Sequence, residues 1–109
     1  MAGVTKHLIN SDAPHRILFS NAQTTKRKHS ARSNLTIHLS RDDGISWPVK
    51  RSIETGPSAY SDLAVLPDGT ILCLYESGTD KPKIKRRRDW AYATLSLARF
   101  NLAWIKGKP

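Results

Sequence analysis

Apolar and polar residues alternate with a period of two in several segments, and this pattern limits the fold of this 109-residue chain more than any other feature. In NLTIHLS (34–40) every second residue is Leu or Ile, so one side of an extended strand is apolar. No window has the 3.6-residue period of a convincing helix. Further strand-like runs are RILFSN (16–21), WPVKRSIE (47–54), SDLAVL (61–66), TILCLYE (70–76) and TLSLARFNLAWI (94–105).

These runs and the turn residues between them predict an all-β fold of about six to eight antiparallel strands in two sheets, with no helix longer than about two turns. Pro67-Asp68-Gly69 has the residues of a hairpin turn, in which Gly69 can take a positive φ. In the last run the alternation slips by one residue near Arg99, which predicts a bulge or bend there.

The length of the chain predicts at most one small domain with a modest core. Its single cysteine, Cys73, stands in the apolar run ILCLY, which predicts a buried thiol, and one cysteine forms no disulfide within the chain. The first ten residues lack the apolar core of a signal peptide, and no run approaches the roughly 20 apolar residues that span a bilayer. We therefore expect no membrane span, and the compartment stays undecided.

The net charge of +9 is concentrated in two short segments. Nine of the 18 Lys and Arg residues lie at 26–28 and 81–88, and the other nine balance the nine Asp and Glu residues. One interpretation is an anionic partner held by Coulomb attraction, and the other is two solvated loops. No aromatic residues alternate with the basic ones to stack on bases, which disfavours nucleic acid as a partner.

One motif is more specific than the strand pattern. Residues 40–47, SRDDGISW, fit S-x-D-x-G-x-[ST]-W. Asp42 can accept backbone N–H groups across such a turn, Gly44 can take a positive φ, and Trp47 can pack beneath the loop. The motif residues that we expect to have this structural role are Ser40, Asp42, Gly44, Ser46 and Trp47.

The motif matches the Asp box (BNR repeat) of sialidases and other β-propellers. Together with SAYSDLAVLPDGTILCLYE (58–76) and LARFNLAWI, the chain resembles the C-terminal part of an exo-α-sialidase (neuraminidase) with a six-bladed propeller. The resemblance covers about residues 15–105, with 1–14 as a lead-in, 81–91 as a basic loop and 106–109 as a tail. It implies about two blades of a sialidase-type β-propeller, with the Asp box on the face away from the active site.

The resemblance implies that Tyr60, in the AYSDL run, is the catalytic nucleophile. Sialic acid carries a carboxylate on its anomeric carbon, so an anionic nucleophile would approach against charge repulsion. A neutral phenol avoids this repulsion and gives a covalent intermediate and retention of configuration. From composition alone, Tyr60 would be interpreted as an ordinary aromatic residue at the start of a strand.

The resemblance also assigns Arg32 and Glu76. Arg32 falls where the family places the third arginine of a triad that clamps the substrate carboxylate, because a guanidinium grips it bidentately. Glu76 matches a glutamate that orients the first arginine of that triad. Without the resemblance, Arg32 is a loop arginine and Glu76 is a carboxylate at a strand end.

Other parts of the family site have no counterpart in this chain, namely an early arginine, an aspartic acid/base, a second arginine and the glutamate that activates the tyrosine. The resemblance therefore implies a C-terminal fragment of a retaining glycoside hydrolase that releases terminal sialic acid and is inactive alone. Its implied partners are a sialylated glycan and the missing N-terminal blades, without metal or cofactor. The alternative is a non-catalytic Asp-box module that binds carbohydrate or another anion.

Overall fold

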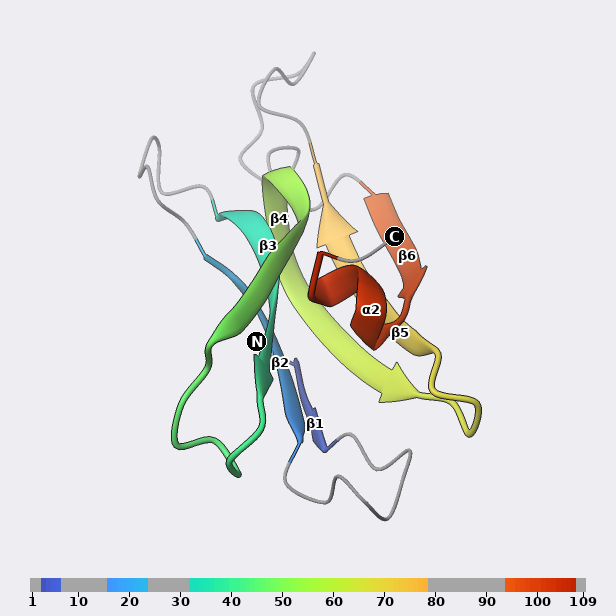
Figure 1. Ribbon diagram of the computed structural model, residues 1–109. Coiled ribbons are helices and arrows are strands. Elements are labelled where there is room, and N and C mark those ends of the chain that lie inside the picture. Colours follow the sequence, from blue (N-terminus) through green and yellow to red (C-terminus); the bar gives the residue numbers. More distant parts are fainter. Residues whose placement is uncertain (1–2, 7–15, 24–31, 79–93, 108–109) are drawn as a thin grey trace.

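Six antiparallel strands form one sheet in the order of the chain, β1-β2-β3-β4-β5-β6 (Figure 1). The computed structural model describes residues 3–6, 16–23, 32–78 and 94–107. The all-β fold predicted from the alternating runs is confirmed, and its arrangement is consistent with about two blades of a β-propeller. The two separate sheets that were also predicted are wrong, because the strands pair continuously in one sheet. The elements are β1 (Gly3–Lys6), β2 (Ile17–Ala22), β3 (Ser33–Ser40), β4 (Val49–Val65), β5 (Ile71–Ser77), β6 (Thr94–Phe100) and a one-turn helix, α2 (Leu102–Ile105).

Strands β2, β3 and β5 lie close to the runs that predict them, but the other runs differ from expectation. The runs 47–54 and 61–66 join in the 17-residue strand β4. The slip near Arg99 predicted a bulge or a bend. No bulge forms, because β6 pairs with β5 in an unbroken register from Thr94 to Phe100, but the chain changes direction directly after Phe100. The slip in alternation instead marks the end of β6, after which the chain turns into α2.

Strand β4 belongs to two parts of the sheet. Its first part pairs with β3, from Val49 opposite Leu39 to Pro57 opposite Ser33, and its second part pairs with β5 from Ser58 onward. We call β1, β2, β3 and the first part of β4 the first half-sheet, and the rest the second half-sheet. The hydroxyl groups of Ser20 in β2 and Ser61 in the second part of β4 lie 2.8 Å apart and buried, so the two half-sheets pack against each other.

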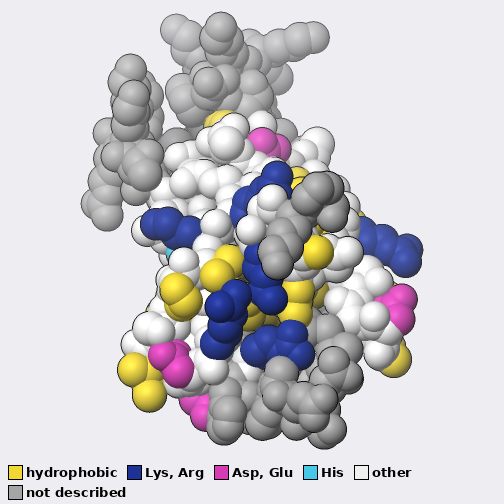
Figure 2. Space-filling model, viewed as in Figure 1, with side chains coloured by type: hydrophobic (Ala, Val, Ile, Leu, Met, Phe, Trp, Pro, Cys, Tyr) yellow, Lys and Arg dark blue, Asp and Glu magenta, His cyan; other side chains and the backbone are white. Residues whose placement is uncertain are grey.

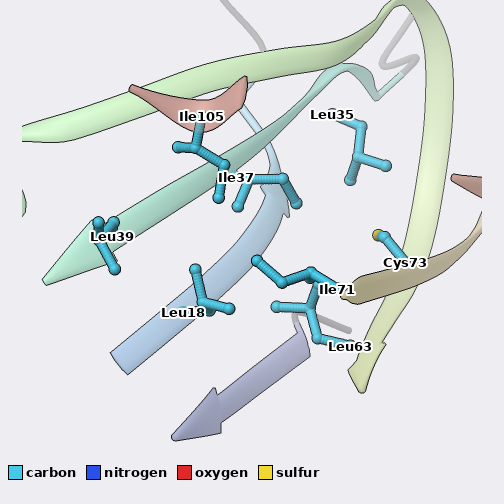
Figure 3. Close-up of a cluster of buried hydrophobic side chains, with 8 residues drawn as sticks. All are labelled: Leu18, Leu35, Ile37, Leu39, Leu63, Ile71, Cys73 and Ile105. Atoms are coloured by element: carbon cyan, nitrogen blue, oxygen red, sulfur yellow. The ribbon is translucent and has the colours of Figure 1, made fainter. Parts of the chain in front are cut away.

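The core lies between the two half-sheets and α2 (Figure 3). All of its side chains are at most 8% exposed. The burial predicted for Cys73 is confirmed, and this burial raises the pKa of its thiol to about 12. The core side chains are Leu18, Leu35, Ile37 and Leu39 from the first half-sheet, Leu63, Ile71 and Cys73 from the second, and Ile105 from α2.

Helix α2 lies against β4 and closes one side of the core (Figure 1). The Asn101 side chain caps it by accepting the Trp104 N–H at 2.9 Å. Leu102 and Ile105, three residues apart, share one side of the turn and pack on the core. Four residues are too few for a helical period to show in the sequence. Among the described residues, no helix is long and apolar enough to cross a membrane.

The outer side of the second half-sheet carries exposed apolar side chains. Leu74 is paired with Leu97, and these side chains are 44% and 62% exposed. Leu95 lies two residues from Leu97 on the same side of β6 and is 66% exposed. Exposed apolar patches of this kind mark surfaces that contact another element or protein.

Replacing Leu39 with Ala tests the shared core. Leu39 is 0% exposed, so Leu39→Ala is expected to lower the free energy of unfolding by about 2–5 kcal/mol. Leu97→Ala is the matched control, and its effect is expected to stay within about 0.5 kcal/mol. Urea unfolding followed by circular dichroism measures both. Equal losses in the two variants would contradict the core described here.

Candidate active site

The structure brings Arg32, Tyr60 and Glu76 together at one end of the sheet. Arg32 directly precedes β3, Tyr60 lies in β4, and Glu76 lies near the end of β5. The guanidinium carbon of Arg32 lies 4.8 Å from the centroid of the Tyr60 ring. The Glu76 Oε1 atom accepts a hydrogen bond from the backbone N–H of Tyr60 at 3.1 Å. Three segments that are far apart in the sequence therefore form one cluster.

A bulge in β4 turns the Tyr60 side chain outward. The register with β5 shifts between Ser58 and Ser61, so the alternation of inward and outward residues starts again there. Ala59 and Ser61 are buried, whereas Tyr60 is 52% exposed. A bulge takes a backbone N–H out of the regular ladder, and here the Glu76 carboxylate supplies an acceptor for it.

The backbone around Asn34 positions Arg32. The Arg32 carbonyl accepts the Ser58 N–H at 3.0 Å, which ties Arg32 to the bulge. Asn34 has a φ of 60°, its amide nitrogen donates to the Gln23 carbonyl at 3.1 Å, and its amide oxygen accepts the Ser52 hydroxyl at 2.7 Å. Sequence reasoning assigned no role to Asn34. The available signal was the preference of Asn for positive φ.

The turn at residues 40–47 is held by side-chain hydrogen bonds. The Ser40 hydroxyl donates to Asp42 Oδ1 and accepts the Gly44 N–H, both at 2.8 Å. The Asp42 carboxylate also accepts the N–H and the hydroxyl of Ser46. These hydrogen bonds, chiefly those from Ser46, lower the pKa of Asp42 to about 2. Gly44 has a φ of 89°, and Trp47 lies beside it.

This turn and the Arg32 cluster lie at opposite ends of β3. Arg32 directly precedes the strand and the turn directly follows it. Eight extended residues separate them by about 25 Å. The Asp42 carboxylate is therefore too far away to act on a ligand at Tyr60.

The other titratable groups of the described residues do not add a metal site. Within that part of the chain, no three His, Cys, Asp or Glu side chains gather closely enough to hold a metal ion. His38 Nε2 lies 2.8 Å from Asn21 Oδ1. The pKa of His38 is lowered, mainly because the ring is partly buried and to a lesser extent because Lys50 is positively charged. The basic segments 26–28 and 81–88 lie outside the described residues.

The sequence is similar to known sialidases. It is 41% identical over 91 residues, or 84% of this chain, to a sialidase of Micromonospora viridifaciens. It is 32% identical over 76 residues, or 70% of this chain, to the sialidases of two Vibrio cholerae strains. The chain belongs to the sialidase family. This sialidase-family chain spans only about a tenth of those relatives, 11% and 10% of their lengths. No protein-family model matches it.

The low pKa of Asp42 makes the stability of the chain depend on pH. Because the folded-state pKa of about 2 lies below the ordinary value of 3.8, the carboxylate stabilises the fold above about pH 4. This contribution is lost as the pH falls toward about 2. Asp42→Asn is expected to be less stable at pH 7 and to lose less stability than the wild type between pH 4 and 2.

The matched control for this prediction is Asp43→Asn, at the next position of the same turn. Asp43 has a φ of 58°, which Asn tolerates well. Thermal unfolding at several pH values measures all three proteins. The account of Asp42 would be wrong if Asp42→Asn kept the full acid-induced loss of stability.

Proposed function

We propose that Arg32, Tyr60 and Glu76 are part of the active site of an exo-α-sialidase, of which this chain supplies the C-terminal blades. The observation that carries the proposal is the 4.8 Å between the Arg32 guanidinium carbon and the centroid of the Tyr60 ring. A sialoside has its carboxylate bonded directly to the anomeric carbon. The group that clamps the carboxylate and the group that attacks the carbon must therefore be neighbours.

Tyr60 is the proposed nucleophile. Its phenol oxygen forms a bond to the anomeric carbon while the bond from that carbon to the leaving glycan oxygen breaks. Water later attacks the anomeric carbon from the face opposite the tyrosine, the face from which the glycan left, and displaces the tyrosine. The two inversions leave sialic acid with its configuration retained. The proton for the leaving oxygen and the base for the phenol come from residues outside this chain. The exposed position of Tyr60 at the bulge supports this role.

Arg32 is the proposed clamp for the substrate carboxylate. A guanidinium presents paired N–H donors that match a carboxylate, and it keeps its charge at every physiological pH. Its backbone is tied to the bulge through the Ser58 N–H, so the clamp and the nucleophile are held by the same segment of β4. The substrate is thus oriented relative to the attacking oxygen before reaction.

Glu76 is a positioning residue in this proposal. Its Oε1 atom accepts a hydrogen bond from the Tyr60 N–H. This hydrogen bond fixes the backbone of the bulge and thereby the position of the Tyr60 phenol. Its other oxygen, Oε2, can accept a hydrogen bond from an arginine of the missing blades, the role that the resemblance implies. One carboxylate would then connect the backbone of the nucleophile to the arginine clamp.

The remaining blades are the proposed partner of this chain. The exposed apolar side chains of Leu74, Leu95 and Leu97 form a surface that a neighbouring blade of a propeller would cover. The small share of the relatives' length that the chain spans supports the same conclusion. In-frame sequence upstream of Met1 with an arginine, an aspartate and further Asp boxes would support it directly.

The chain alone is expected not to hydrolyse a sialoside at a useful rate. The general acid, two arginines and the base for Tyr60 are missing, and loss of one member of such a set commonly costs about 10³-fold or more. A fluorogenic sialoside measures hydrolysis, with a full-length sialidase as the positive control. Robust turnover by the isolated chain would contradict the proposed division of the site.

In the full-length parent, Tyr60→Phe is expected to lower kcat by about 10³-fold or more and to leave binding of an unsaturated sialic acid analogue largely intact. Arg32→Ala is expected to weaken that binding as well as to slow turnover. Tyr75→Phe removes a hydroxyl from the same half-sheet and is expected to retain turnover. Near-normal turnover by Tyr60→Phe would exclude Tyr60 as the nucleophile.

A further inference from the structure

A basic hollow of about 580 Å³ lies between the start of β4 and α2. Figure 2 shows Lys and Arg side chains gathered around hydrophobic side chains on this face of the molecule. The volume lies within the usual range of about 300–1,000 Å³ for small-molecule sites. The side chains that matter for its chemistry are the cations Arg41, Lys50, Arg51 and Lys106 and the apolar Val49 and Ile105.

The hollow is separate from the candidate active site. Arg41 follows the last residue of β3, whereas Arg32 precedes its first residue. The length of the strand puts about 25 Å between these two positions. A ligand of monosaccharide size in the hollow therefore cannot reach Tyr60, and its binding can be tested independently of hydrolysis.

Among the described residues that line the hollow, every charged one is positive. Arg41, Lys50 and Arg51 place positive charge around one concave surface, and this charge attracts an anion. The apolar side chains of Val49 and Ile105 form part of the wall, where charges are less screened than in bulk water. The chemistry of the lining thus favours a ligand with a concentrated negative charge.

Arg51 is held in place before any ligand binds. Its guanidinium donates to the Trp104 carbonyl, and its guanidinium carbon lies 4.0 Å from the centroid of the Trp104 ring. Trp104 is in turn positioned by the cap that Asn101 provides for α2. A fixed guanidinium loses less conformational entropy on binding than a mobile one, and its other N–H groups match the geometry of an oxyanion.

We propose that this hollow binds a tetrahedral oxyanion ester, a sulfate or a phosphate, carried on a small ring such as a monosaccharide. The cations hold the ester oxygens, with Arg51 as the fixed donor and Arg41 as a second guanidinium. The apolar side of the ring packs on Val49. The proposal does not depend on the active-site assignment, because none of its residues belongs to that cluster.

The test is a titration of the full chain followed by NMR of backbone amides, with glucose 6-phosphate, glucose 6-sulfate, inorganic phosphate and glucose as probes. At least one ester is expected to shift the amide signals of Lys50, Arg51 and Gly107, and the preferred ester identifies the anion. Glucose is expected to shift none of them. Inorganic phosphate is expected to shift the same amides with lower affinity, because it lacks the ring.

Variants that remove cations inside and outside the hollow distinguish binding at a defined site from general attraction to the positive charge of the chain. Arg41→Gln with Lys50→Gln removes two cations of the hollow and is expected to weaken ester binding at least tenfold, the usual order for lost charged hydrogen bonds. As a pair with matched charge, Arg41→Gln is compared with Arg99→Gln, which removes one cation from β6 outside the hollow and is expected to change affinity by less than about twofold. Circular dichroism checks that all of these variants fold.

The proposal is overturned if neither ester shifts the amides around the hollow at millimolar concentration. It is also overturned if Arg41→Gln and Arg99→Gln lose affinity equally, because binding would then follow net charge. If glucose bound as tightly as the esters, the oxyanion would not be the recognised group. If inorganic phosphate bound as tightly as the esters, the ring would contribute nothing to recognition.

Discussion

The bulge in β4 between Ser58 and Ser61 is the feature on which the rest of the structure depends. Strand β4 leaves β3 and joins β5 at this point, so the bulge connects the two half-sheets. It also resets the alternation of side chains, so that the Ser61 side chain is buried and the Tyr60 side chain is exposed. One irregularity in a strand therefore sets both the packing of the core and the position of the proposed nucleophile.

Strand β3 separates two regions with different chemistry. At its start, Arg32 lies over the Tyr60 ring and is tied to the bulge. At its end, the Asp42 carboxylate closes a turn with hydrogen bonds to its own neighbours, and its low pKa follows from those bonds. A carboxylate with its hydrogen bonds already made is suited to hold a turn, whereas an exposed phenol beside a guanidinium is suited to meet a ligand.

The helix at the C-terminal end links the core to the surface. Ile105 packs into the core, and Trp104 on the same turn holds Arg51 through its carbonyl and its ring. The packing of Ile105 in the core thus also fixes the position of the Arg51 guanidinium at the surface. This arrangement explains why a basic hollow forms beside α2 rather than a set of independent, fully solvated side chains.

The sequence by itself determined the all-β class, the positions of β2, β3 and β5, and the burial of Cys73, because alternation and apolar runs act locally. It also placed Arg32, Tyr60 and Glu76 in family motifs. Only the tertiary structure decided that β4 is one strand, that the slip near Arg99 marks a helix, and that Glu76 holds the Tyr60 N–H. These features depend on register and packing between distant segments, which a period-2 pattern does not encode.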